Sequence, residues 1–261
     1  MRILVTNDDG VFAPGIKALA RALEPLGQVY VVAPDREQSA SSHALTLQQP
    51  LRLNHLEERV WSVTGTPTDS VLVAVHGVMS AEPPDLVVSG INAGPNMGDD
   101  VTYSGTVSAA FEGTLLSIPS IAVSLASLEE PFHYETAAAW AVRLARQVLS
   151  RRLPPKTLLN VNVPSLPEAD IKGLRLTRLG HRVYRETISE KIDPRGKPYF
   201  WVGGYADWAP EEATDIQAIR AGYVSVTPLN LDLTDYKLLI EMEGWRLGEG
   251  GHAPAPGTDA G

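Results

Sequence analysis

The stretch that decides the fold is MRILVTNDDG, residues 1–10. Its apolar run predicts a short buried strand over residues 2–6, and that strand leads into two adjacent carboxylates, Asp8 and Asp9. Two like charges side by side at the end of a buried strand repel each other. We therefore expect a feature at this strand end that offsets the repulsion.

The residues that follow predict a strand, a helix and a second strand. Residues 15–26 have apolar side chains at helical spacing, and residues 28–33 form another apolar run. Such a unit implies a parallel pair of strands with a right-handed crossover. The alternation continues with helices expected at 68–78, 104–116 and 134–152, and strands expected at 85–89, 120–125 and 157–163. The pattern predicts an α/β fold: a Rossmann-like, three-layer parallel sheet with helices on both faces.

The style of the sequence changes after residue 164. We expect residues 1–164 to form a Rossmann-like catalytic core and 165–246 to form a C-terminal part with a β-hairpin arm at 174–202. The turn of the arm is expected at 194–196, and the aromatic run at 199–201 beside it is exposed apolar surface that a second subunit would cover. A short helix at 215–221, a strand at 223–227, a last helix from residue 234 and a disordered tail at 247–261 complete the expected order.

The composition excludes several classes of protein. The 22 Lys and Arg against 31 Asp and Glu give a net charge of −9, which argues against a nucleic-acid polymer as partner. The absence of cysteine excludes disulfides, thiolate metal sites and cysteine nucleophiles. No apolar run reaches the roughly 20 residues that span a bilayer, so we expect no membrane association and a cytoplasmic location.

The aspartate pair stands where a dinucleotide-binding fold would have a glycine-rich phosphate loop, so a dinucleotide cofactor is disfavoured. Paired carboxylates at a strand end bind a hard cation, share one proton, or act as nucleophile and acid. The simpler structural alternative is that one aspartate caps a turn and the other is solvated. Oxygen donors follow the neighbouring strands, namely the hydroxyls of Ser39, Ser41 and Ser42 and the amides of Asn92 and Asn96. These ligand types favour Mg²⁺ or Mn²⁺ over Zn²⁺.

A predicted helix start lies next to these residues. Ser104, Gly105 and Thr106 open a helix whose first backbone N–H groups have no partner within the helix. Small residues let a ligand approach, so the helix start is a candidate anion site. Ser104 as a plain N-cap is the alternative, and the two roles are compatible. A cation and a helix start side by side suit a phosphate monoester.

The motifs together resemble a known family. The chain closely resembles the SurE family (stationary-phase survival protein) of metal-dependent nucleotidases. The matching stretches are ILVTNDDG (3–10), APDREQSASSHALTL (33–47), VTGTPTDSV (63–71), VVSGINAGPNMGDDVTYSGTVSAAFEG (87–113) and VSVTPLNLDLTDY (224–236).

The resemblance implies an activity and a site. It implies hydrolysis of nucleoside 5′- and 3′-monophosphates, with some action on short polyphosphate. It implies one divalent cation per subunit, held by Asp8, Asp9, Ser39 and Asn92. It also implies a homodimer or homotetramer built through an exchanged C-terminal arm.

For the reaction we expect metal-assisted attack of water on phosphorus. Asn96 and the helix start at Ser104, Gly105 and Thr106 would meet the charge on the phosphoryl oxygens. Asp8 or Asp9 would accept the proton of the water. His43, in the loop of Ser39, is a candidate to protonate the leaving oxygen; the alternative is a loop histidine with no catalytic role.

Two other classes remain open at this point. A phosphatase of the haloacid dehalogenase type would use Asp8 as covalent nucleophile, but that class needs D-x-D, and adjacent residues on an extended strand point to opposite faces. A non-catalytic protein that binds nucleotide and metal is the second alternative, because a site that binds phosphate need not catalyse hydrolysis.

Overall fold

A computed structural model describes residues 1–184, 188–202 and 206–245 of the chain. Within these ranges the main sheet has nine strands in the order β3-β4-β2-β1-β5-β6-β7-β13-β8. They are β1 (Arg2–Thr6), β2 (Gln28–Pro34), β3 (Leu53–Glu57), β4 (Val60–Val63), β5 (Leu86–Ala93), β6 (Ser120–Ala126), β7 (Thr157–Pro164), β8 (Leu174–Leu176) and β13 (Val224–Asn230). The strands from β4 to β7 in this order run parallel to one another, whereas β3 and β13 run antiparallel to their neighbours β4 and β7. The predicted α/β fold with a mostly parallel sheet is confirmed.

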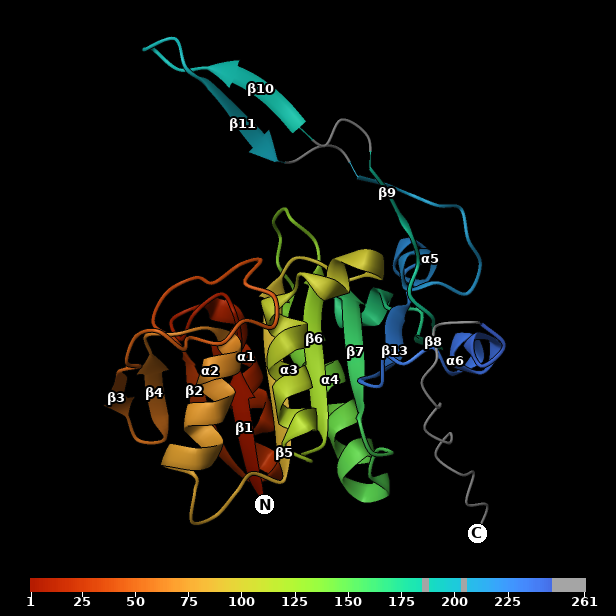
Figure 1. The fold of residues 1–261 in the computed structure, drawn as a ribbon. Helices are drawn as coiled ribbons and strands as arrows, with labels where there is room; N and C mark the ends of the chain where they lie inside the picture. The colour runs from red at the N-terminus through yellow and green to blue at the C-terminus, as the bar shows by residue number, and fades with distance from the viewer. Residues whose placement is uncertain (185–187, 203–205, 246–261) are drawn as a thin grey trace.

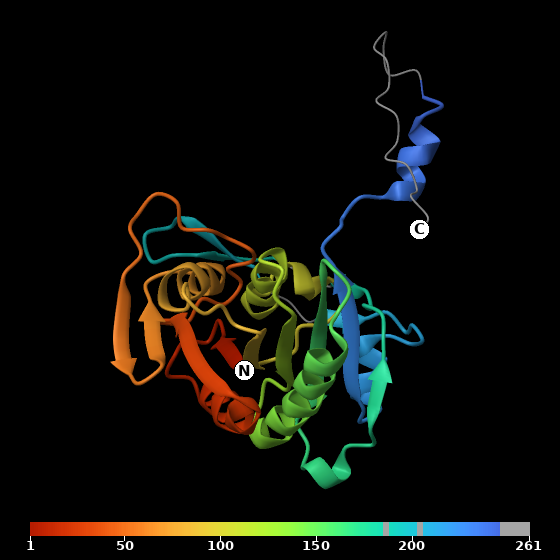
Figure 2. The ribbon, with the colours of Figure 1, turned by 90° about the horizontal axis from the view of Figure 1, so that it is seen from below.

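Helices cover both faces of this sheet (Figures 1 and 2). The helices are α1 (Pro14–Leu23), α2 (Pro67–Val73), α3 (Gly105–Leu115), α4 (Tyr134–Arg151), α5 (Asp215–Arg220) and α6 (Tyr236–Met242), with shorter helical turns η1 (Glu24–Leu26), η2 (Ala74–Val78), η3 (Gly98–Thr102) and η4 (Glu168–Asp170). One core cluster lies between the sheet and α1 and α4, and a second lies between the sheet and α2 and α3. The three layers place the carboxyl ends of the parallel strands along one edge of the sheet.

Local sequence explains where these elements begin. Thr66 caps α2: its side chain accepts a hydrogen bond from the N–H of Asp69, and the Asp69 carboxylate accepts one from the N–H of Thr66. Ser104 caps α3 by accepting the N–H of Val107 at 3.0 Å. The resemblance stretch at 63–71 therefore has the structural role of starting a helix.

Two strands of the sheet have no counterpart in the sequence prediction. Every residue of β3 is exposed, so this strand has no buried face that would require apolar and polar residues to alternate. The strand β4 has only four residues, too few for a clear pattern. The strand predicted at 85–89 is longer than expected, because β5 continues through Gly90 and Asn92, residue types that favour turns.

The arm differs from the single hairpin predicted over 174–202. Its first residues form β8, which pairs in parallel with β13 at the edge of the main sheet. The arm proper consists of β9 (Arg182–Tyr184) paired with β12 (Ala206–Trp208), and β10 (Ile188–Ile192) paired with β11 (Pro198–Val202). The turn lies at 194–196 as predicted, with Gly196 at a φ of +77°.

The arm and the last helix project from the body (Figures 1 and 2). All residues of β10 and β11 are exposed, and no residue of α6 is buried. Both elements carry large apolar side chains on these exposed surfaces: Ile188, Ile192, Tyr199, Phe200, Trp201, Val202, Leu238, Leu239 and Ile240. The predicted tail at 247–261 lies outside the described residues.

Candidate functional site

The adjacent aspartates lie at the carboxyl end of β1, in a tight turn. Asn7 builds this turn: its amide donates to the carbonyl of Gly10 at 3.0 Å, and its side-chain oxygen accepts the N–H of Gly10 at 3.2 Å. Gly10 has a φ of +97°, and a Cβ there would lie 3.2 Å from the backbone of Arg36. The turn therefore presents Asp8 and Asp9 in a fixed orientation beside the loop that follows β2.

Asp8 lies directly against the start of α3. The Thr106 hydroxyl donates to Oδ1 of Asp8. A Cβ on Gly105 would lie 3.0 Å from Oδ2 of Asp8 and 3.0 Å from Oγ of Ser41. Only glycine at this position allows the helix start to approach the carboxylate so closely. The structure thus brings together Asp8, Gly105 and Thr106, three residues of the predicted site.

Asp9 points toward a different element. Its Oδ2 accepts the backbone N–H of Ala93, at the end of β5, at 3.1 Å. The carboxylate lies close enough to Tyr134, the first residue of α4, that its charge adds to the effect of burial in raising the pKa of the Tyr134 phenol. Within the turn after β1 the two adjacent side chains therefore contact different elements, α3 for Asp8 and β5 for Asp9.

Burial raises the pKa of both carboxyl groups. Asp8 has only 5% of its surface exposed, and burial raises its pKa to about 6; the hydrogen bond from Thr106 opposes this shift and the charge of Asp9 adds to it. Burial also raises the pKa of Asp9, opposed by the N–H of Ala93 and increased by the charge of Glu37. Within the described ranges neither carboxylate has an ion-pair partner.

The two predicted asparagines are held by different contacts. Asn92 is half-buried in β5 and its amide donates to the carbonyl of Gly94 at 2.8 Å. Asn96 is buried, and its amide donates to the Ser124 hydroxyl at 2.8 Å. Two side chains of β7 bind the backbone of Asn96. Its N–H donates to Oδ1 of Asn162, and its carbonyl accepts from the side-chain amides of Asn160 and Asn162.

The loop after β2 carries Ser39 and His43. The N–H of Gln38 donates to the carbonyl of Asp8 at 2.8 Å, which places the start of this loop beside the aspartates. Ser39 Oγ donates to Glu37 Oε1 at 2.7 Å. His43 lies farther along α3: its Nε2 is 2.9 Å from Oε2 of Glu112. Glu112 is eight residues after Ser104, about 12 Å along the helix axis.

The donor set fits a hard divalent cation. A buried carboxylate (Asp8) beside a half-buried one (Asp9), with no cationic side chain paired to either, is costly, and a bound cation removes this cost. The Ser41 hydroxyl is buried between Asp8 and Gly105 and has no hydrogen-bond partner among the described residues. Those ranges contain no group of three or more histidine, aspartate or glutamate side chains that would hold a metal, so any site here combines the carboxylates with hydroxyl and amide oxygens.

Sequence reasoning did not find several residues that shape this site. Asn160 and Asn162 touch it from β7, and the charge of Asp9 acts on Tyr134. The asparagines on β7 were visible as polar residues inside an apolar run, TLLNVNVP, which is the signal that was available. Nothing local to Tyr134 distinguishes it from an ordinary helix residue.

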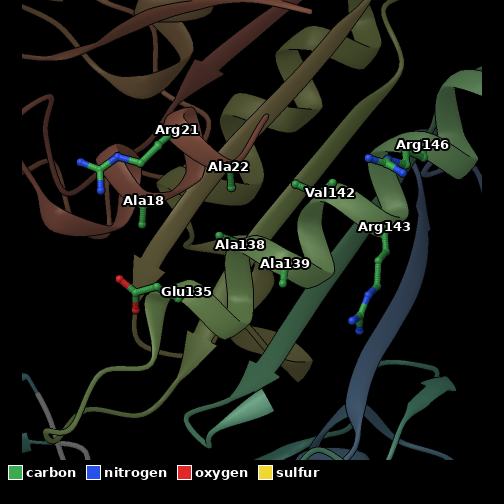
Figure 3. Close-up of a pocket in the computed structure, with 9 residues that line it drawn as sticks. All are labelled: Ala18, Arg21, Ala22, Glu135, Ala138, Ala139, Val142, Arg143 and Arg146. Carbon is green, nitrogen blue, oxygen red and sulfur yellow. The ribbon is translucent and has the colours of Figure 1, made fainter. Parts of the chain in front are cut away.

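A hollow of about 480 Å³ lies elsewhere, on the outer surface between α1 and α4 (Figure 3). Its floor is mostly alanine, and the guanidinium groups of Arg21 and Arg143 point away from each other (Figure 3). None of the predicted site residues lines it. Its shape results from small residues where two helices pack closely.

Comparison with known proteins identifies the class. A model of the family described as Survival protein SurE matches residues 3–186, and the chain therefore belongs to the SurE family. The chain is 53% identical over 248 residues to a protein named 5′-nucleotidase SurE from Geotalea daltonii, an alignment that covers 95% of this chain and all of the relative.

Other relatives agree. A 5′-nucleotidase SurE from Legionella pneumophila is 54% identical over 239 residues, covering 91% of this chain and 94% of the relative. The crystal structure of the SurE protein from Aquifex aeolicus is similar with a TM-score of 0.84 and 45% identity, covering 93% of this chain and 98% of that one. None of the helices in the described ranges combines the length and the apolar character that crossing a membrane requires.

Proposed function

We propose that this protein is a metal-dependent 5′-nucleotidase, a hydrolase that converts nucleoside 5′- and 3′-monophosphates to nucleoside and phosphate, with short polyphosphate as a further substrate. The observation that carries the proposal is the contact between the buried Asp8 carboxylate and the first turn of α3, through Gly105 and Thr106. This contact would place a cation site at Asp8 directly next to an anion site at the start of α3. The relatives named 5′-nucleotidase, at about half identity over nearly the whole chain, support the same activity.

One divalent cation per subunit, Mg²⁺ or Mn²⁺, is proposed to bind Asp8, Asp9, Ser39 and Asn92. When bound, the ion lowers the pKa of a coordinated water and polarises a phosphoryl oxygen. The fixed turn at Asn7 holds both carboxylates in place before the ion arrives. The hydrogen bond from Thr106 orients Asp8, and the N–H of Ala93 orients Asp9.

The substrate phosphate is proposed to bind at the start of α3. Among the described residues the backbone N–H of Gly105 has no acceptor, whereas that of Thr106 donates to the Asp8 carboxylate and those of Val107 and Ser108 are used by Ser104. A free N–H group at the positive end of a helix binds a phosphate oxygen. The Ser104 hydroxyl and Asn96 would complete the cradle and meet the charge that develops on the phosphoryl oxygens.

Proton transfers complete the proposed reaction. Asp8 or Asp9 accepts the proton of the attacking water. His43 is the candidate to protonate the leaving oxygen, and because Nε2 contacts Glu112, that proton would leave from Nδ1. The position of Glu112 along α3 supports a second role for His43 more strongly, as an anchor that holds the loop of Ser39 on the helix.

The arm and α6 are proposed to join subunits into a homodimer or homotetramer. Their exposed apolar side chains support this, since a monomer rarely exposes so large an apolar surface on a projecting element. We place the protein in the cytoplasm, with no nucleic-acid polymer and no membrane as partner.

The experiment that tests the proposed function is release of inorganic phosphate from a panel of nucleoside 5′- and 3′-monophosphates. The assay is run as purified, with chelator, and with Mg²⁺ or Mn²⁺ restored. We expect release that disappears with chelator and returns with metal. Tight nucleotide binding without release under any metal would instead support a non-catalytic binding protein. Trapping of an aspartyl-phosphate would support the haloacid dehalogenase mechanism.

A further inference from the structure

Asp215 is a buried carboxylate that the proposed reaction does not use. It lies at the first position of α5, more than 100 residues from the aspartate pair, and its side chain is fully buried. Its three hydrogen-bond donors are all backbone N–H groups: Gly98 at 2.8 Å on Oδ2, and Gly180 at 3.0 Å and Ile216 at 2.9 Å on Oδ1. A carboxylate surrounded by donors holds its neighbours most strongly when it is ionised.

The partners of Asp215 connect two functional parts of the molecule. Gly98 opens η3, within the segment that joins Asn96 to Ser104, the two ends of the proposed phosphate cradle. Gly180 lies between β8 and β9, at the foot of the arm. The two glycines are in close contact, because a Cβ on Gly98 would lie 2.6 Å from the Gly180 carbonyl oxygen and 3.1 Å from the ring of Trp208.

Further contacts tie the same segment to the arm. Asp99 Oδ2 accepts the backbone N–H of Arg182 at 2.9 Å, and the Arg182 guanidinium forms an ion pair with Asp100. The Arg182 guanidinium also lies 5.8 Å from the ring centroid of Trp208 on β12. Both strands at the base of the arm therefore contact η3: β9 does so through Arg182 and β12 through Trp208.

The opposite end of the segment is fixed by other means. Asn96 is held by Ser124, Asn160 and Asn162 of the sheet, so it does not depend on the arm. Residues 98–100, by contrast, receive their side-chain contacts from Asp215 and Arg182. The C-terminal part of the protein consequently fixes the first half of the path from Gly98 into Ser104, whereas Ser42 of the loop after β2 holds the carbonyls of Thr102 and Tyr103 in its second half.

We propose that Asp215 is a positioning residue for the phosphate cradle, and that the foot of the arm and the cradle form one mechanical unit. This rests on the proposed function for the identity of the cradle. Asp215 touches no reacting atom; it fixes where η3 delivers Ser104 and the first turn of α3. Rearrangement of the arm on assembly would then change phosphate affinity and turnover at the site.

The test compares Asp215→Asn with wild type in kcat, KM and inhibition by inorganic phosphate. The amide replaces one acceptor oxygen with an NH₂ group that faces an N–H donor, so one of the two links is lost. We expect kcat/KM to fall by about 10- to 100-fold, as misplacement of a binding segment produces. The inhibition constant of phosphate should rise in parallel. The metal concentration for half-maximal activity should stay within about twofold, because Asp8 and Asp9 lie outside the segment.

A matched control separates positioning from simple destabilisation. Thr214→Ala removes the N-cap of the same helix, whose hydroxyl accepts the N–H of Gln217, but keeps both links of Asp215. It should lower Tm without changing kcat or the phosphate inhibition constant. Equal kinetic losses in Thr214→Ala and Asp215→Asn would overturn the proposal.

A second variant keeps the test decisive if Asp215→Asn does not fold. Asp99 is exposed, so Asp99→Ala leaves the fold intact and removes only its link to Arg182. We expect a change in the same direction of about fivefold, the effect of one hydrogen bond. Wild-type kinetics in both variants would contradict the proposal.

The failure of the proposed function is recognised separately. Wild-type protein that releases no phosphate with any metal disproves the nucleotidase. Calorimetric titration of inorganic phosphate in the presence of Mn²⁺ then still measures whether Asp215→Asn lowers the affinity of the cradle for phosphate. Equal phosphate affinity of the two proteins would disprove the positioning role of Asp215.

Discussion

The carboxyl edge of the sheet and the arm have opposite patterns of burial: the sheet edge buries polar side chains, and the arm exposes apolar ones. At the sheet edge, polar side chains such as Asp8, Asn96 and Thr106 are buried and bonded to defined partners. On the arm, large apolar side chains such as Phe200 and Trp201 are exposed. The contrast shows that the single chain buries the polar groups of its candidate active site, whereas it leaves the apolar side chains of the arm uncovered, as the proposed subunit interface requires.

The strongest way to break this comparison is to remove a charge at the sheet edge. Asp8→Asn and Asp9→Asn should each lower phosphate release by about 10³-fold at saturating metal, since they remove a charged metal ligand. The fold should persist, because a like-charge repulsion is relieved. The measurement is kcat with circular dichroism and Tm for each variant. A loss of activity that follows a loss of Tm would show that the aspartates hold the fold and not a cation.

The stability of the metal-free protein should depend on pH through Asp8. Its pKa is raised from 3.8 to about 6, so the stability it contributes is present below pH 3.8 and is lost as the pH rises through about 6. With metal removed, Asp8→Asn should thus be more stable than wild type at pH 7.5, by roughly 3 kcal/mol at most, and the gap should close by pH 4. Urea unfolding at both pH values measures it.

Metal addition provides the control for that experiment. Metal that binds only the folded state should stabilise wild type at pH 7.5 and leave Asp8→Asn nearly unchanged. A variant that gains as much stability from metal as wild type does would indicate a cation site that excludes Asp8.

The arm should respond to substitution with a change in assembly and little change in the body. Trp201→Ser removes a large exposed aromatic side chain of β11 and should weaken subunit association by about 2 kcal/mol. Light scattering over a dilution series measures the oligomeric state. Leu176→Ser is the matched control, because Leu176 is a similarly exposed apolar residue in β8 of the main sheet. Equal dissociation in both variants would argue against a specific arm interface.

The smallest expected effect is at His43. If it anchors the Ser39 loop on α3 through Glu112, His43→Gln and Glu112→Gln should each lower activity by less than about tenfold. If His43 donates the proton to the leaving oxygen, His43→Gln alone should cost about 100-fold or more and should remove one limb of the pH–rate profile. Steady-state kinetics from pH 5 to 9 distinguish these roles.

Local patterns predicted the elements that have strong periodicity or clear termini. The buried run of β1, the helical spacing in α1 and α4 and the cap at Ser104 all lie within a few residues of their predicted positions. The exposed strand β3 has no such signal, and local pattern alone places β8 in the arm, because its pairing with β13 depends on residues about 50 positions away.

The candidate site divides in the same way. Asp8, Gly105 and Thr106 come together because parallel strands end at one edge and a helix begins there, which the sequence order implies. Asp215 was not predicted, since its partners Gly98 and Gly180 are 117 and 35 residues distant. When the donors to a carboxylate are backbone N–H groups far away in the chain, the residues next to it in the sequence give no sign of its role.

The reversed direction of β13 separates the two projecting elements. Its last residue, Asn230, pairs with Thr157 at the start of β7, so the chain leaves the sheet for α6 at the edge opposite to Asp8. The arm leaves beside η3, at the carboxyl edge. A tether joined to the end of α6 would consequently hold the protein on a surface or a bead with its candidate site directed toward the solution. Immobilised assays or fusions should therefore be built from that end.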